Sequence, residues 1–196
     1  MIFNKLNFLI NCSGKDKFFV DNINFEDMNI LIKKYFDTDF SVNIKFCNSI
    51  EEFKFFFPFE FKEWICGFFI NDIIFVFSPE ILEKFTTHKK EDIPRIIFHE
   101  LVHIVYKQCG FTRNNLFFEG FATFLTKKYS KNKENIKSIN LDSINLHDYP
   151  ILSKRVYADG ERVISTIIKN YGKDKLMYVV KNLKNEKKLS HFLSEK

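Results

Sequence analysis

Residues 98–105 read FHELVHIV, in which two histidines and a glutamate interrupt an apolar segment. His99 and His103 are four residues apart, so on a helix both imidazoles project from one face and can converge on one ion. Glu100 is displaced by about 100° around the helix, near such an ion without having to bind it. This H-E-x-x-H spacing predicts that the imidazoles hold Zn²⁺ and that the carboxylate takes a proton from a water at the metal.

The five-residue motif leaves an alternative open, because two core histidines can also be satisfied by ordinary hydrogen bonds. A third ligand decides between the two, and Glu119 in LFFEGFA (116–122) is the candidate. A carboxylate in so apolar a helix is unfavourable unless it is paired, protonated or bound to a metal. Three protein ligands and one open position form the coordination pattern of a catalytic zinc site, with one zinc per chain.

Two helices must carry these residues. Asp92 can cap the first, Pro94 fits its first turn, and the helix is expected to run to about Gln108, where Gly110 can end it. Residues 104–118, which separate His103 from Glu119, are enough to end the first helix, form a turn and begin a second helix that runs back along the first. The second helix is expected over 115–129, with Glu119 facing the histidines.

The first half of the chain shows mixed periodicity. Apolar residues recur at helical spacing over 25–36 and alternate as in a strand over 42–47. Ser49 followed by Glu52 resembles a capping box that opens a short helix. Two apolar runs, 64–70 and 73–77, flank Asn71-Asp72 and predict a β-hairpin.

Beyond Ser78-Pro79 the pattern is helical, with further helices expected near 152–171 and 174–183 and Gly172 between them. The chain therefore predicts the α+β class, with a small, mainly antiparallel sheet and an edge hairpin followed by a helical half. At 196 residues and 45% hydrophobic it suits one core, so we expect a single domain over 1–196, β-rich over 1–78 and helical over 79–196.

Charge and composition exclude several classes of function. The formal charge is +5, and its one basic cluster, residues 127–137, is interrupted by Asn and Glu. We interpret this cluster as a solvated helix end, and expect no nucleic-acid partner. The phenylalanine-rich run 53–62 is interpreted as core, although a membrane-docking or partner-binding patch is the alternative.

Four cysteines, far apart and without a C-x-x-C pair, predict reduced and mostly buried thiols rather than a disulfide framework or a cysteine zinc site. The N-terminal apolar run is short and broken by asparagines, which makes a poor signal peptide. No stretch approaches the roughly 18 apolar residues of a membrane span. The expected location is the cytoplasm, and the sequence does not predict an oligomeric state.

Three segments in order resemble the gluzincin metallopeptidases, zinc enzymes with an H-E-x-x-H helix and a glutamate as third ligand. They are HELVH (99–103) with FFEGFA (117–122), the Y-x-x-G-x-x-V segment 157–163, and the helix-YG-helix segment 167–183. The similarity is to the peptidase-MA-like domains related to the zinc aminopeptidases. It covers roughly residues 60–185 and implies a zincin-like fold.

The resemblance implies a role for each matched residue. His99, His103 and Glu119 would bind zinc, and Glu100 would be the general base and later the proton donor. Tyr157 would donate a hydrogen bond to the oxyanion, unless it is only an aromatic packed between helices. His147 is the alternative oxyanion partner, since some gluzincins use a histidine there.

One further residue is predicted to orient a zinc-binding histidine. Where some gluzincins place an aspartate that orients a zinc-bound histidine, this chain has Thr123. Its hydroxyl can accept a hydrogen bond from an imidazole N–H, but it adds no negative charge. We therefore hypothesise that Thr123 weakly orients His99 or His103.

The resemblance implies hydrolysis of peptide bonds in a peptide or protein substrate. No G-x-M-E-N segment, which grips a free amino terminus in the aminopeptidases, precedes the zinc helix, so endopeptidase action is favoured. A strand of the 64–77 hairpin could bind extended substrate at the sheet edge, with Gly67 allowing close approach, or the hairpin could be purely structural. The alternative functions are a catalytically inactive metal-binding or protein-interaction module, and a helical domain without metal.

Overall fold

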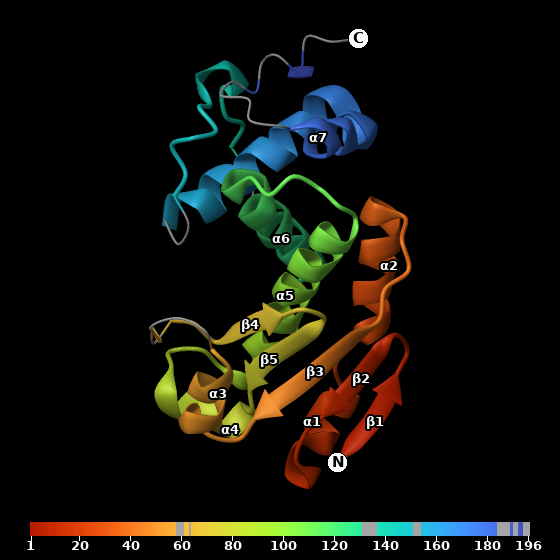
Figure 1. The fold of residues 1–196 in the computed structure, drawn as a ribbon, viewed down its shortest axis with the longest axis vertical. Coiled ribbons are helices and arrows are strands. Elements are labelled where there is room, and N and C mark those ends of the chain that lie inside the picture. The colour runs from red at the N-terminus through yellow and green to blue at the C-terminus, as the bar shows by residue number, and fades with distance from the viewer. Residues whose placement is uncertain are drawn as a thin grey trace. The chain divides into compact units, whose positions relative to one another are not determined.

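The structure is a computed structural model that describes residues 1–57, 61–62, 64–130, 137–150, 154–183, 189 and 192–193 (Figure 1). Helices and a sheet are both present, which confirms the predicted α+β class. The chain forms two compact units, Met1–Ile104 and Val105–Lys196. The first unit contains α4 (Pro79–Phe85) and most of α5 (Ile93–Gln108) as well as the sheet. The single domain expected over 1–196 stays a prediction.

The sheet of the first unit has five strands in the order β1-β2-β3-β5-β4, namely β1 Ile2–Lys5, β2 Phe8–Asn11, β3 Val42–Cys47, β5 Ile73–Phe77 and β4 Gly67–Ile70. The outer pairs, β1 with β2 and β4 with β5, are antiparallel, whereas β2 with β3 and β3 with β5 are parallel. The prediction of a mainly antiparallel sheet was therefore wrong. Long connections containing helices separate the central strands, and such crossovers permit parallel pairing.

The predicted hairpin is present as β4 and β5, which pair antiparallel across Asn71-Asp72. Asn71 has a φ of 52°, a left-handed conformation that asparagine tolerates well. β4 is the last strand in the sheet order, so it is an edge strand among the residues that the structure describes.

One face of the sheet forms the core of the first unit. Its side chains are in register across β2, β3 and β5 and are almost completely buried: Phe8, Ile10, Val42, Ile44, Phe46, Ile74 and Val76. α2 (Phe25–Phe36) packs on this face through the ring of Phe25, 4.6 Å from that of Phe8. The register places Gly67 and Phe69 of β4 on the same face, where they contact α5.

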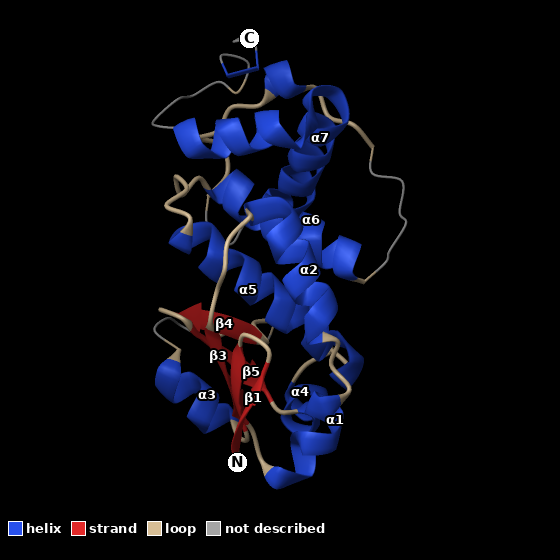
Figure 2. Ribbon diagram, turned by 90° about the vertical axis from the view of Figure 1, so that its right-hand side faces the viewer, coloured by secondary structure: helices blue, strands red, loops and turns tan. Residues whose placement is uncertain are grey.

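The opposite face is covered by α3 (Ile50–Phe56) beside β4 and β5 (Figure 2). The ring of Phe53 lies 4.0 Å from that of Phe77 and 4.8 Å from that of Phe68. Ser49 caps α3 by accepting a hydrogen bond from the backbone N–H of Glu52, as the sequence predicted. Phe53 is buried, which confirms the predicted core position for this residue of the run 53–62. Phe55 is exposed instead, and residues 58–60 are outside the part of the chain that the structure describes.

The second unit is built on α6 (Asn115–Tyr129) and α7 (Lys154–Asn182). α5 ends at Gln108, and Gly110 follows with a φ of 68°, confirming the predicted helix end. Tyr106 donates a hydrogen bond to the carbonyl of Thr112, and Asn114 caps α6 by accepting from Leu116 N–H. α7 is interrupted at Gly172, so the predicted break between two helices is also present.

The backbones of α6 and α7 touch at two glycines. A Cβ on Gly120 would lie 2.6 Å from the carbonyl carbon of Gly160, and one on Gly160 would lie 2.4 Å from the carbonyl oxygen of Leu116. A glycine inside a helix costs about 0.5–1 kcal/mol relative to alanine. The close approach of the two helices explains why neither position carries a side chain.

The cysteines follow the prediction: all four are free, with Cys12, Cys47 and Cys66 buried and Cys109 half-buried. None of the helices in the described ranges is long and apolar enough to cross a membrane. Within the basic cluster 127–137, residues 131–136 are not described, so its predicted role is left untested.

Candidate metal centre

α5 brings the two histidines of the motif onto one face. Their Nε2 atoms lie 3.1 Å apart, and the two rings are nearly perpendicular, with 89° between their planes. His103 is buried, and its ring lies 5.8 Å from that of Phe69 on β4. The sequence indicated no partner for His103 on the sheet, because ring packing of this kind depends on the register of β4.

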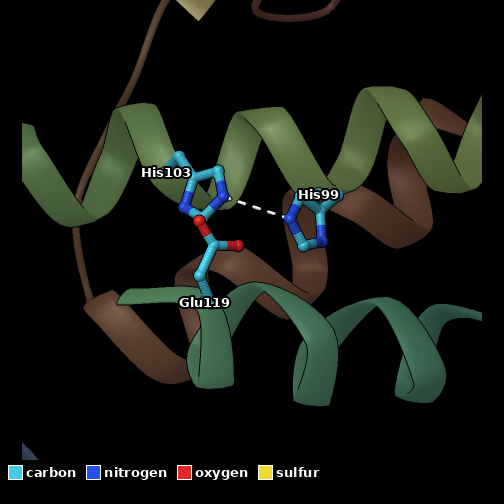
Figure 3. A group of neighbouring side chains, drawn as sticks. All are labelled: His99, His103 and Glu119. Atoms are coloured by element: carbon cyan, nitrogen blue, oxygen red, sulfur yellow. Dashed lines mark hydrogen bonds between the residues drawn. The ribbon is translucent and has the colours of Figure 1, made fainter. Parts of the chain in front are cut away.

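Glu119 joins the two histidines. Its carboxylate and the two imidazoles each offer an atom, and these atoms all lie within 4.8 Å of one another. Figure 3 shows the carboxylate rising from α6 toward both rings on α5. The three residues that the sequence predicted as ligands are therefore gathered at one place.

The donor set fits a zinc ion. Two ligands at tetrahedral positions about 2.05 Å from zinc are separated by roughly 3.3 Å, close to the 3.1 Å between the imidazole nitrogens. Two neutral imidazoles at this distance either share a proton or bind a common ion. The Glu119 carboxylate, with an oxygen within 4.8 Å of a nitrogen of each ring, completes a set of nitrogen and oxygen donors of the kind that Zn²⁺ accepts.

No cysteine belongs to the group of candidate ligands gathered among the described residues. Burial is the largest cause that raises the pKa of Cys66 to about 11 and that of Cys47 to about 12. Both thiols therefore stay protonated near neutral pH when no metal is bound.

Glu100 lies beside the edge strand. A Cβ on Gly67 would lie 2.4 Å from Cγ2 of Ile96 and 3.6 Å from Cγ of Glu100. The glycine thus allows β4 to approach α5 itself, whereas the sequence suggested approach by a substrate. The half-buried Glu100 side chain is thereby placed next to β4 and one residue from His99, a candidate ligand.

Tyr157 is on α7 and is half-buried. It lies one helical turn before Gly160, so both residues share a face of the helix. That face is turned toward α6, because Gly160 contacts Gly120, the residue after Glu119.

His147 is exposed, in a turn fixed to the start of α6. Asn115 Nδ2 donates to the carbonyl of Tyr149 at 3.0 Å, and Asp148 N–H donates to the carbonyl of Asn145. His147 therefore remains the alternative oxyanion partner, on an exposed turn rather than on the α7 face that contacts α6.

Thr123 is one turn after Glu119 on α6, but its predicted hydrogen bond is not made. Its Oγ1 atom is buried and has no hydrogen-bond partner in the structure, so it orients neither His99 nor His103 there. One turn further along α6, Lys127 Nζ forms an ion pair with Glu161 Oε2 of α7, at 2.8 Å. The sequence did not indicate this pair, because the relative placement of α6 and α7 was unknown.

We expect Thr123→Val to leave zinc affinity unchanged and to stabilise the protein by about 1 kcal/mol, since an unpaired buried hydroxyl is replaced by a methyl group. Denaturant unfolding and zinc titration of the variant and the parent check this. A clear loss of zinc affinity would restore the orienting role of Thr123.

Searches against protein-family models, curated proteins and solved structures found no match to this chain.

Proposed function

We propose that this chain is a zinc-dependent metallopeptidase of the gluzincin type, more suited to internal peptide bonds than to amino-terminal ones. The convergence of His99, His103 and Glu119 carries the proposal. Glu100 supports catalysis rather than a purely structural site, because a structural metal does not need a carboxylate beside its ligands.

The chain's own residues can supply the steps of amide hydrolysis. A zinc ion held by the three ligands would polarise the carbonyl and make water a good nucleophile near neutral pH. Glu100 takes the proton of the attacking water and later gives it to the departing nitrogen. Tyr157 donates a hydrogen bond to the oxyanion as the carbonyl carbon becomes tetrahedral.

The edge strand β4 supports binding of an extended peptide. Among the residues that the structure describes it pairs only with β5, so a row of its backbone groups can form main-chain hydrogen bonds with a substrate. Gly67 begins β4 and lies beside Glu100, so a peptide aligned on this edge would pass the general base.

The proposed setting is the cytoplasm, and the proposed partner is a peptide or protein rather than nucleic acid. Free thiols, three of them buried, suit a reducing compartment. The missing G-x-M-E-N segment leaves no dedicated group for a free amino terminus, which favours endopeptidase action.

Tyr157→Phe is expected to lower kcat by about 10²–10³-fold with little change in KM, because one oxyanion donor is removed while the ring is kept. His147→Ala is the matched comparison and is expected to change kcat by less than about threefold. Steady-state kinetics on one quenched-fluorescence peptide measure both. The opposite ranking would assign the oxyanion role to His147.

The proposal as a whole is tested with a library of internally quenched peptides, blocked at both ends. The zinc-loaded parent is expected to cleave some members, and removal of zinc by a chelator is expected to abolish cleavage. If the parent binds zinc but cleaves no peptide, the inactive metal-binding or interaction module replaces the peptidase. If it binds no zinc, the helical domain without metal is supported.

A further inference from the structure

The contact between α6 and α7 bears directly on the third metal ligand. Gly120 immediately follows Glu119, and its backbone touches that of Gly160 on α7. The obstacle to a side chain at either glycine is backbone rather than a flexible side chain, so one of the helices would have to move. Movement of α6 at Gly120 would carry Glu119 with it.

A second contact joins the same two helices. The carboxylate of Glu161, the residue after Gly160, is buried and pairs with Lys127 of α6 at 2.8 Å. The Lys127 side chain is 33% exposed, so the restraint comes from the carboxylate, because separating the pair leaves the buried charge of Glu161 without compensation. The glycine contact and the ion pair together restrict both the distance between the helices and the shift of one along the other.

We propose that Gly120, Gly160 and Glu161 are positioning residues that hold Glu119 where it can bind the metal. The inference rests on the metal centre of the proposed function and extends it to α7, a helix that supplies none of the three ligands. α7 acts on zinc binding through Glu119. The effect of changing α7 therefore depends on the presence of the Glu119 carboxylate.

Zinc affinity, measured by competition with a chromophoric chelator, tests this without any substrate. Gly160→Ala is expected to weaken binding by about tenfold or more, as loss of an orienting contact commonly does. Glu161→Gln keeps the side-chain shape, removes the charge that holds Lys127, and is expected to weaken binding by a few-fold. Gly14→Ala is the matched control, because a Cβ there meets no atom within 4 Å.

The decisive comparison repeats each variant in a Glu119→Ala background. If α7 acts through Glu119, neither Gly160→Ala nor Glu161→Gln weakens the residual affinity further. An equal loss with and without Glu119, or parental affinity in a folded Gly160→Ala protein, would overturn the proposal. Circular dichroism reports folding, and Glu161→Gln decides the question if Gly160→Ala is unfolded.

The outcomes also separate this inference from the proposed function. A parent that binds no zinc overturns both. A parent that binds zinc, shows the dependence on Glu119 and cleaves no peptide retains the positioning role and loses the peptidase assignment.

Discussion

Glu100→Gln is expected to lower peptide hydrolysis by about 10³-fold or more while the protein keeps one zinc per chain. The amide has nearly the shape of the carboxylate, but it does not take up the proton of the attacking water. Glu100 is half-buried beside Gly67 and is not one of the three gathered ligands, so metal binding is expected to survive. Kinetics on one peptide and zinc analysis of the same preparation measure both quantities.

Glu91→Gln is the control for this substitution, since it removes an exposed carboxylate two residues before α5 begins. It is expected to keep full activity. Equal activity of the parent and Glu100→Gln would show that the cleavage came from another group or a contaminating protease.

Glu119→Ala is expected to weaken zinc binding by at least about 100-fold, because it removes one of the three proposed ligands, and loss of an orienting contact alone can cost 10–100-fold. The two histidines stay 3.1 Å apart on α5 and retain a weak site. Hydrolysis is expected to disappear at zinc concentrations that saturate the parent. Chelator competition and kinetics at fixed free zinc measure the two effects.

Asp142→Ala removes an exposed carboxylate from the unit that carries Glu119 and serves as the control. Its zinc affinity is expected to equal that of the parent. If Glu119→Ala also bound zinc like the parent, the carboxylate would not be a ligand, despite its position beside the imidazoles.

Local chemistry made several parts of the site predictable. The four-residue spacing of His99 and His103 fixes their common face on any regular helix. Gly110 can end α5 because glycine adopts a positive φ easily. Ser49 can cap α3 because its hydroxyl accepts a hydrogen bond from the backbone N–H of Glu52, three residues later. Glu119 could be anticipated because an isolated carboxylate in an apolar helix needs a partner.

Long-range relations could not be predicted in this way. The sheet order depends on β5 pairing with β3 across a connection that contains α3 and β4, and nothing local specifies that pairing. The contact of Gly120 with Gly160 and the Lys127–Glu161 pair likewise depend on how α6 meets α7.

The N-terminal hairpin of β1 and β2 was not predicted from the sequence, because the residues of its turn are not typical of hairpin turns. Its two-residue turn contains Leu6 with a φ of 53°, where a leucine is unusual. Hairpin turns are recognised in sequences by Gly, Asn or Asp at such positions, and Leu6-Asn7 gives only a weak signal.

The proposed peptidase activity depends on the binding of zinc by two imidazoles and one carboxylate. The zinc K-edge X-ray absorption spectrum of the purified protein tests it directly. We predict one zinc per chain, with nitrogen and oxygen neighbours at about 2.0–2.2 Å and a multiple-scattering pattern of two imidazoles. A sulfur neighbour at about 2.3 Å, or a protein that takes up no zinc, would contradict the proposed zinc site.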